Sequence, residues 1–267
     1  MSKIEDQRIL IFCNEKKNIK QTIIDAAFLA LKLEKEVCFF ACYNNEKGKE
    51  QLQKETSSYA TILKKDIPQL PVSTLVLKGK LYKLVRELGE KYNTIMLCSG
   101  GEVSNSYLKA FYNSGFPFYF SREGRSIDKA FKRIIIPVDF RSGTKDSVLW
   151  GSYLGRFNGS EITLFKAKDN DNDLSEKVED GIASALKLYN KFSFSYKVTE
   201  SNVSSWKIHL KAMELSDEYD LLIFTGSFNV ILPDWIMGPF EKRIVNKLKA
   251  TPVLLINPQS EMYVICS

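Results

Sequence analysis

The chain repeats one order of strands and helices twice, and this internal repeat constrains the fold more than any single motif. The segment "RILIFCN" at residues 8–14 matches "RIIIPVD" at residues 133–139, at an offset of 125 (133 − 8). Each copy has a polar start followed by a continuous apolar run, which is typical of a strand buried on both faces. A polar turn, a helix and a second buried strand follow in both copies, so two similar units are predicted.

The parallel continues to the end of each copy. Polar helices are expected at about 46–66 and 174–191, and third strands follow them at 72–79 and 194–201. Amphipathic helices come next. Fourth strands are expected at 94–101 and 220–227, and fifth strands at 116–122 and 251–257. Strands that alternate with helices need right-handed crossovers, which give a mainly parallel sheet with helices on both faces. The predicted fold class is α/β, with two tandem Rossmann-like units, residues 1–125 and 126–267, joined by a linker near residues 122–132.

Composition excludes several classes of function. No apolar run approaches the roughly 20 residues that span a bilayer, and residues 1–8 lack the apolar core of a signal peptide, so a cytoplasmic protein without a membrane partner is expected. The five cysteines include no second close pair, which favours free, reduced core thiols over a metal site. The net charge of +6 comes from single lysines spread over the first copy, so no nucleic-acid partner is expected.

Ligands on such sheets bind at the carboxyl ends of the strands, where the strand order reverses. In the second copy, Asp139 directly follows the first strand and could accept hydrogen bonds from a ribose hydroxyl or an adenine amino group. The alternative is that Asp139 or Ser142 caps the next helix. The first copy has Asn14 at the equivalent position and lacks the carboxylate.

The segment after the fourth strand of the second copy has the outline of a phosphate loop. Gly226 and Gly238 could let the backbone approach a phosphate at a helix N-terminus. The alternative is a turn glycine and a helix-start glycine with no ligand, because residues 230–237 are apolar and Pro239 has no N–H to donate.

Residues 133–258 resemble the universal stress protein family in its tandem-domain form, on the segments "KRIIIPVDFRSG", "MELSDEYDLLIFTGSFN" and "KATPVLLINP". The first copy is similar to the family only in its order of strands and helices and in the segments "RILIFCN" and "IMLCSGG". The resemblance implies an adenine nucleotide α-hydrolase-like fold with a five-stranded parallel sheet of order 3-2-1-4-5 in each unit. It also implies that the two units pair within the chain through their fifth strands, and that the protein has a role in stress physiology.

Many members of that family bind ATP with a loop of the form G-x-x-G-(x)9-G-[ST]. By this resemblance the cofactor-binding positions are Asp139 for the aspartate after strand one, Ala167 for the strand-two contact, and Gly226, Asn229, Gly238 and Pro239 for the loop. Asn229 replaces the second glycine, the spacer has eight residues, and Gly238-Pro239 replaces the closing pair. These replacements remove two phosphate donors, the side-chain hydroxyl that closes the family loop and one backbone N–H. A hydrogen bond from each is worth about 1 kcal/mol, or about 1.5–3 kcal/mol if it is charge-assisted, so a large loss of affinity for ATP is predicted.

The first copy is expected to bind no nucleotide. Its connection after strand four is nine residues shorter than that of the second copy (135 − 126), which leaves little room for a full loop and helix.

The expected function is therefore a non-enzymatic regulatory role in stress response, through association with an unidentified protein or with a second copy, with weak or absent nucleotide binding and no cofactor. The alternative is an ATP-binding protein that uses the altered loop of the second unit, with slow hydrolysis. A true enzyme is disfavoured, because the single histidine, His209, shares an apolar helix face with Trp206, Leu210 and Met213 and is expected to be a packed structural residue. The apolar residues 230–237 and the tail 261–267 are candidate association surfaces. The alternative for residues 230–237 is that they fold over the mouth of their own unit, which is the ligand position at the carboxyl ends of its strands. The alternative for the tail is one more strand at an edge of the sheet.

Overall fold

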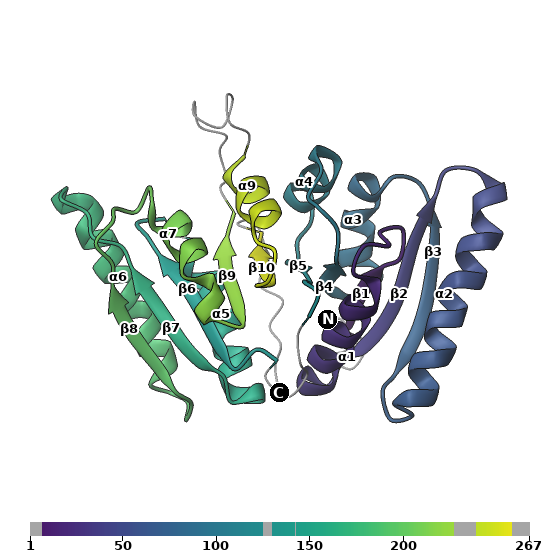
Figure 1. The fold of residues 1–267 in the computed structure, drawn as a ribbon, viewed down its shortest axis with the longest axis horizontal. Coiled ribbons are helices and arrows are strands. Elements are labelled where there is room, and N and C mark those ends of the chain that lie inside the picture. Colours follow the sequence, from purple (N-terminus) through teal and green to yellow (C-terminus); the bar gives the residue numbers. More distant parts are fainter. Residues whose placement is uncertain (1–6, 125–129, 142, 227–238, 258–267) are drawn as a thin grey trace. The chain divides into compact units, whose positions relative to one another are not determined.

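The computed structural model describes residues 7–124, 130–141, 143–226 and 239–257 (Figure 1). These residues fall into two compact α/β units, one in residues 7–124 and the other in residues 130–257. The predicted boundary between residues 125 and 126 and the tail at 261–267 lie outside the described residues.

The first unit alternates strands and helices along its whole length. Its elements are β1 (Arg8–Phe12), α1 (Ile19–Leu33), β2 (Glu36–Tyr43), α2 (Glu46–Asp66), β3 (Val72–Lys78), α3 (Leu81–Glu90), β4 (Thr94–Ser99), α4 (Asn105–Tyr112) and β5 (Phe118–Phe120).

The second unit repeats this order. Its elements are β6 (Arg133–Val138), α5 (Thr144–Asn158), β7 (Glu161–Lys166), α6 (Asn172–Tyr189), β8 (Tyr196–Glu200), α7 (Ile208–Glu214), a short 3-10 helix (Ser216–Glu218), β9 (Leu221–Thr225), α9 (Phe240–Lys247) and β10 (Val253–Ile256).

The sheet of each unit has the predicted strand order. In the first unit the order is β3-β2-β1-β4-β5, and in the second it is β8-β7-β6-β9-β10, which is 3-2-1-4-5 in both cases. Adjacent strands within each unit are parallel, with Leu10 opposite Cys38 in one and Ile134 opposite Leu221 in the other. The order reverses at β1 and β4, and again at β6 and β9. The carboxyl ends of β6 and β9 are thus where the fold places a ligand site.

Helices cover both faces of each sheet. α5 contacts α6, whereas α3 contacts α4 and α7 contacts α9. Right-handed crossovers put the first two helices of a unit on one face and the last two on the other once the strand order reverses. The central strands are consequently buried except at one end residue of β1, β6 and β9, as the continuous apolar runs predicted, and β4 is buried at every residue.

Short polar residues start several helices. The side chains of Asn45, Ser104 and Asp171 accept hydrogen bonds from the first-turn N–H groups of α2, α4 and α6. At the other end of α5, Gly159 adopts a left-handed conformation with φ 64°, which glycine tolerates without steric cost.

The first unit differs from the sequence prediction in one connection. The shortened segment after β4 was expected to leave little room for a loop and a helix, but it contains the eight-residue helix α4. α9 is also eight residues long. The difference in length therefore lies between the strand and the helix, in residues 100–104 of the first unit compared with residues 226–239 of the second.

The described cysteines are free thiols, in line with the prediction. Cys13, Cys38 and Cys98 are buried. Burial raises the pKa of the Cys13 thiol to about 12 and that of Cys38 to about 11. These thiols therefore remain protonated and unreactive near neutral pH.

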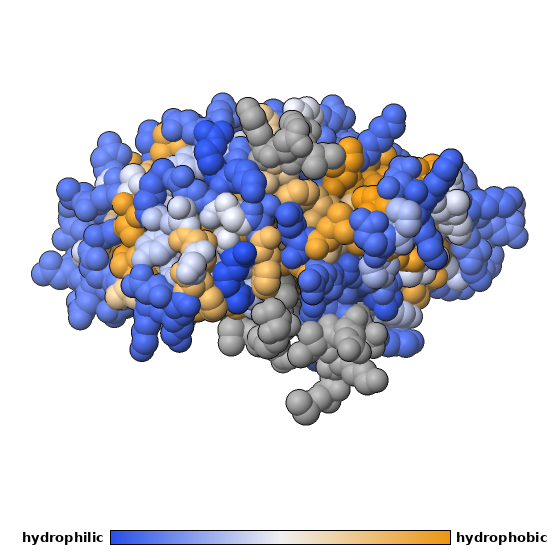
Figure 2. All heavy atoms as spheres, turned by 90° about the horizontal axis from the view of Figure 1, so that it is seen from below, coloured by the Kyte–Doolittle hydropathy of each residue, from blue (hydrophilic) through white to orange (hydrophobic). Residues whose placement is uncertain are grey.

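Figure 2 shows one face of the molecule, on which hydrophilic residues predominate and hydrophobic residues gather in smaller patches. Among the described residues, the large apolar side chains with the greatest exposure are Ile24, Leu31, Ile62, Val198 and Trp206. None of the helices in the described part of the chain is long and apolar enough to cross a membrane.

Candidate functional site

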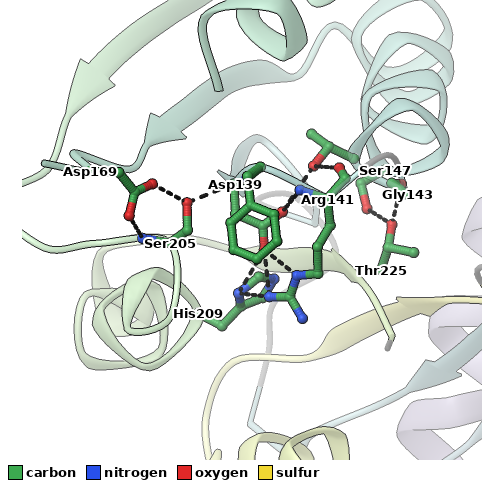
Figure 3. A network of polar contacts seen from close by, with 10 residues as sticks. Asp139, Arg141, Gly143, Ser147, Asp169, Ser205, His209 and Thr225 are labelled. Carbon is green, nitrogen blue, oxygen red and sulfur yellow. Dashed lines mark hydrogen bonds and ion pairs between the residues drawn. The ribbon is translucent and has the colours of Figure 1, made fainter. Parts of the chain in front are cut away.

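The candidate site lies at the carboxyl edge of the second sheet, in the loops that follow β6, β7 and β8 and at the end of β9 (Figure 3). The residues drawn there belong to the β6–α5 loop, the start of α5, the β7–α6 loop, α7 with the loop before it, and the end of β9. The reversal of strand order at β6 and β9 brings these segments together.

Asp139 makes hydrogen bonds through both carboxylate oxygens to its own loop. Oδ1 accepts the backbone N–H of Arg141 at 2.9 Å and the hydroxyl of Thr144 at 3.5 Å. Oδ2 accepts Nε–H of Arg141 at 2.5 Å and forms an ion pair with Nη2 of the same side chain. Asp139 is only 3% exposed. A ligand that used this carboxylate would have to compete with the guanidinium of Arg141.

Arg141 connects three elements of the unit. Its Nη2 lies 3.2 Å from Nδ1 of His209 on α7. Its guanidinium carbon lies 5.3 Å from the ring centroid of Phe240, the first residue of α9. The arginine side chain is 31% exposed, so it covers Asp139 and keeps part of its surface toward solvent. The contact links the β6–α5 loop to α7 and to α9.

His209 is packed among aromatic rings, as the helix pattern predicted, but it is also a hydrogen-bond acceptor. Its ring centroid lies 5.6 Å from that of Phe224 and 5.3 Å from that of Phe240. Burial lowers the pKa of His209 to about 4; Asp139 raises this pKa and Arg141 lowers it. The imidazole is therefore neutral near pH 7, and because Nδ1 faces a guanidinium donor, its proton lies on Nε2. The only acceptor nitrogen is thus occupied, which leaves no general base there.

The end of β9 packs closely on the start of α5. The hydroxyl of Thr225 donates to the carbonyl oxygen of Gly143 at 2.6 Å, and Oγ of Ser147 lies 2.7 Å from Oγ1 of Thr225. A Cβ at Gly143 would lie 2.7 Å from Cγ2 of Thr225, so this close approach requires glycine. The next residue, Gly226, donates its N–H to the carbonyl oxygen of Ile256 at 2.9 Å. Its amide therefore extends the β9–β10 ladder.

The loop after β7 is fixed to the loop before α7. The backbone N–H of Ala167 donates to the carbonyl oxygen of Val138 at 3.0 Å, and Ala167 is buried. Asp169 accepts the N–H of Ser205 at 3.0 Å and the Ser205 hydroxyl at 2.5 Å. The Ser205 oxygen also accepts the N–H of Phe140 at 3.3 Å, so a chain of hydrogen bonds joins all three loops.

The sequence-derived site residues have different outcomes. Asp139, Ala167, Gly226 and Pro239 all lie at the carboxyl edge of the second unit, where Pro239 immediately precedes α9. Asn229 and Gly238 lie outside the described residues. No ligand contact tests any of these residues, so their assignment as cofactor-binding positions stays a prediction.

The alternative interpretation was that Asp139 or Ser142 caps the next helix, α5. The N-cap position of α5 is Gly143, which has no side chain to cap the helix, and none of the hydrogen bonds described for Asp139 reaches a backbone N–H of the first turn. It accepts the N–H of Arg141 in the loop and the Thr144 hydroxyl. Ser142, the other candidate cap, lies outside the described residues.

Sequence reasoning missed Arg141. It stands two residues after Asp139, and a cation at that spacing in a loop can fold back onto the carboxylate. This local charge pattern could have suggested the ion pair, but the contacts with His209 and Phe240 depend on packing between distant segments.

At the equivalent edge of the first unit, the loops that follow the strands contact one another directly. Asn14 binds the backbone of Cys42 in both directions, because its Nδ2 donates to the carbonyl oxygen and its Oδ1 accepts the N–H, both at 2.8 Å. A Cβ at Gly100 would lie 2.2 Å from the carbonyl oxygen of Lys17, so the loops after β1 and β4 are in direct contact. Tyr107 of α4 is 9% exposed, and its ring centroid lies 5.8 Å from that of Phe12 at the end of β1.

These features define a doubly wound, Rossmann-like α/β protein in which Asn14 and Asp139, at the carboxyl edges of the two sheets, bind groups of their own unit. Within that class, the fold is similar to a universal stress protein from Archaeoglobus fulgidus, with a TM-score of 0.68 and 11% identity over 95% of this chain and 97% of the other. The predicted likeness to the universal stress protein fold is thus confirmed at the level of the fold.

Two other solved structures share the fold. A protein of unknown function from Pseudomonas aeruginosa aligns with a TM-score of 0.62 and 12% identity, over 95% of this chain and 93% of the other. The cytoplasmic domain of a prokaryotic cation chloride cotransporter aligns with a TM-score of 0.57 and 12% identity, over 97% of this chain and 98% of the other. Neither a protein-family model nor a curated protein matches the sequence.

Proposed function

We propose that this chain is a non-enzymatic regulatory protein of the universal stress type, which acts in stress response by association and whose nucleotide site is occupied by its own Arg141. The observation that carries the proposal is the contact of both Asp139 oxygens with Arg141. The fold likeness to a universal stress protein supports the class.

The energetics of the ion pair favour weak or absent nucleotide binding. A ribose or adenine group would have to replace a charge-assisted contact of the buried Asp139 carboxylate. Such a hydrogen bond is worth about 1.5–3 kcal/mol, which corresponds to a roughly 10- to 100-fold loss of affinity.

The phosphate side of the mouth supports the same conclusion. Gly226 uses its amide within the sheet, and Pro239 has no N–H at the start of α9. Two backbone donors that could hold phosphate oxygens are thus missing from the described ends of this connection. In the first unit, the Asn14 clamp on Cys42 supports a structural role.

The non-enzymatic part of the proposal is supported by His209. Nδ1, the acceptor nitrogen of its neutral imidazole, faces the guanidinium of Arg141 and is not free to act as a general base. The same fold is found in the cytoplasmic domain of a prokaryotic cation chloride cotransporter, and we propose association as the way in which this chain acts. The partner would be another protein or a second copy of this chain, and the cytoplasm is the proposed location.

The test is titration of the purified protein with magnesium ATP, followed by calorimetry and by thermal unfolding. A ligand at about 100 times its Kd stabilises a protein by about 2.7 kcal/mol, which is readily detected. We expect no stabilisation of the wild-type protein at millimolar ATP. The variant Arg141→Ser exposes the Asp139 carboxylate and should bind ATP more tightly than wild type, whereas the matched control Arg86→Ser on the exposed face of α3 should not. Saturable ATP binding by the wild type at micromolar concentration would overturn the proposal in favour of the ATP-binding alternative.

A further inference from the structure

A polar pocket of about 540 Å³ lies beside the Asp139 cluster, between the loops that follow β7 and β8. Its volume falls in the range of roughly 300–1,000 Å³ that is usual for small-molecule sites. The lining residues are all polar, and none of them belongs to the cluster described above: Lys168, Asn170, Glu200, Ser201, Asn202 and Ser204.

The two walls of the pocket are held together by hydrogen bonds between their backbones and side chains. The N–H of Lys168 donates to the carbonyl oxygen of Val203 at 2.9 Å, and the N–H of Ser201 donates to that of Lys166 at 2.8 Å. Asp169 and Ser205, which face each other in Figure 3, join the same two loops. The pocket is therefore a preorganised feature of the fold, since a ligand would not have to order these loops.

The charges in the lining compensate one another. Nζ of Lys168 lies 3.6 Å from Oε1 of Glu200, and both side chains are more than half exposed. An anionic ligand would be repelled by Glu200 and a cationic ligand by Lys168, unless the ligand separated the pair. The remaining lining side chains are the two carboxamides of Asn170 and Asn202 and the two hydroxyls of Ser201 and Ser204, which both donate and accept hydrogen bonds. This composition favours a neutral ligand with many hydroxyl groups.

An exposed aromatic residue stands next to this pocket. Trp206 is 60% exposed, which is the highest value among the large apolar side chains described. It follows the lining residue Ser204 by two positions, so its backbone lies within about 7 Å of the pocket wall. Its ring is supported from one side by Phe140, at 5.1 Å between centroids. Two residues after the lining residue Ser204, this exposed indole offers an apolar face for the C–H groups of a sugar ring and an N–H donor.

We propose that this pocket binds a neutral, polyhydroxylated small molecule, a sugar or a cyclic polyol, with Asn170 and Asn202 binding the hydroxyls and Trp206 covering one face of the ring. The proposal goes beyond the regulatory function and does not depend on it, because the pocket is separate from Asp139 and Arg141.

The experiment uses the full-length protein with D-glucose, trehalose and myo-inositol as neutral probes, and inorganic phosphate as the charged counter-probe. Saturation-transfer NMR reports binding of each probe, and tryptophan fluorescence reports contact with Trp206. We expect saturable transfer to at least one neutral probe, with a change in emission that disappears in Trp206→Phe. Trp150 is buried and should not respond.

The double substitution of Asn170 and Asn202 by alanine should weaken binding about tenfold or more, because two pairs of hydrogen-bonding groups are lost. The matched control is Asn44→Ala, which removes an exposed asparagine of the first unit. Circular dichroism verifies that each variant is folded. The proposal is overturned if none of the neutral probes binds the wild type at tens of millimolar, if phosphate competes with them for the pocket, or if the double variant binds them as the control does.

Discussion

The guanidinium of Arg141 lies on the carboxylate of Asp139, two residues earlier in the same loop, and also on the imidazole of His209. The aspartate is 3% exposed and the arginine side chain 31% exposed, so the pair is shielded on the aspartate side only. Its consequences for stability and for pH dependence can be measured separately.

Replacing Arg141 with alanine should lower the free energy of unfolding by at least about 2 kcal/mol, because it leaves a buried carboxylate without its charged partner. Urea unfolding measures this change. The control Arg86→Ala breaks an exposed pair with Glu90 and should have almost no effect. In the double variant Asp139→Ala with Arg141→Ala, part of the loss should be recovered. Equal effects of the two single arginine variants would contradict the buried ion pair.

Acidification should destabilise the fold through His209. Its pKa in the folded state is about 4, below the ordinary value of 6.5, so the unfolded chain binds this proton first as the pH falls. The stabilisation from the neutral imidazole is complete above about pH 6.5 and is lost between pH 6.5 and 4, by up to about 3 kcal/mol in total.

Since His209 is the only histidine, its titration can be followed directly by NMR of the imidazole protons. The variant His209→Gln should show a weaker pH dependence of its urea midpoint over the same interval. A measured pKa near 6.5 in the folded protein would show that the ring is not buried as described.

Asn14 should matter for the stability of the first unit and not for ligand binding. Asn14→Ala removes both hydrogen bonds to the backbone of Cys42, and because the site is partly open to water, the expected loss is about 1 kcal/mol. Asn14→Asp keeps the acceptor for the Cys42 N–H but places a carboxylate near the Cys42 carbonyl oxygen, so it should not restore stability. Chemical unfolding of both variants, with ATP titration of Asn14→Asp, provides the measurement. Nucleotide binding by the aspartate variant would show that the first mouth is open.

Two helical glycines of the second unit should respond in opposite directions to alanine. At Gly151 of α5, a Cβ would lie 2.5 Å from the hydroxyl oxygen of Tyr189 and 2.6 Å from Cδ1 of Ile136. Overpacking there should cost about 1–3 kcal/mol. At Gly181 of α6 the nearest atom is Cγ1 of Val138 at 3.5 Å, which is an ordinary contact.

Gly181→Ala should therefore stabilise the unit by about 0.5–1 kcal/mol, because alanine loses less backbone entropy in a helix. Thermal unfolding of the two variants side by side is sufficient. Stabilisation by both variants would mean that helix propensity, and not the packing of α5 on β6, decides their effect, and destabilisation by both would contradict the ordinary contact at Gly181.

The sequence predicted the fold because its signals are local and repeated. Continuous apolar runs such as residues 8–14 and 133–139 mark strands that are buried on both faces, and their recurrence at one offset predicts two similar units with ligand sites at the carboxyl edge. The same alignment placed Asp139 and Ala167 correctly at that edge. It could not locate the helix α4, because a shortened connection does not show whether the loop or the helix has lost residues.

Only the tertiary structure decided what the site residues contact. The state of Asp139 depends on Arg141, which is near in sequence, but the arginine is held there by His209 on α7 and Phe240 on α9, which come from distant parts of the chain. The polar pocket likewise needs the loops after β7 and β8 to meet. Strand periodicity is a property of neighbouring residues and can be read from the sequence, whereas the occupation of a mouth depends on side chains that meet only when the chain has folded.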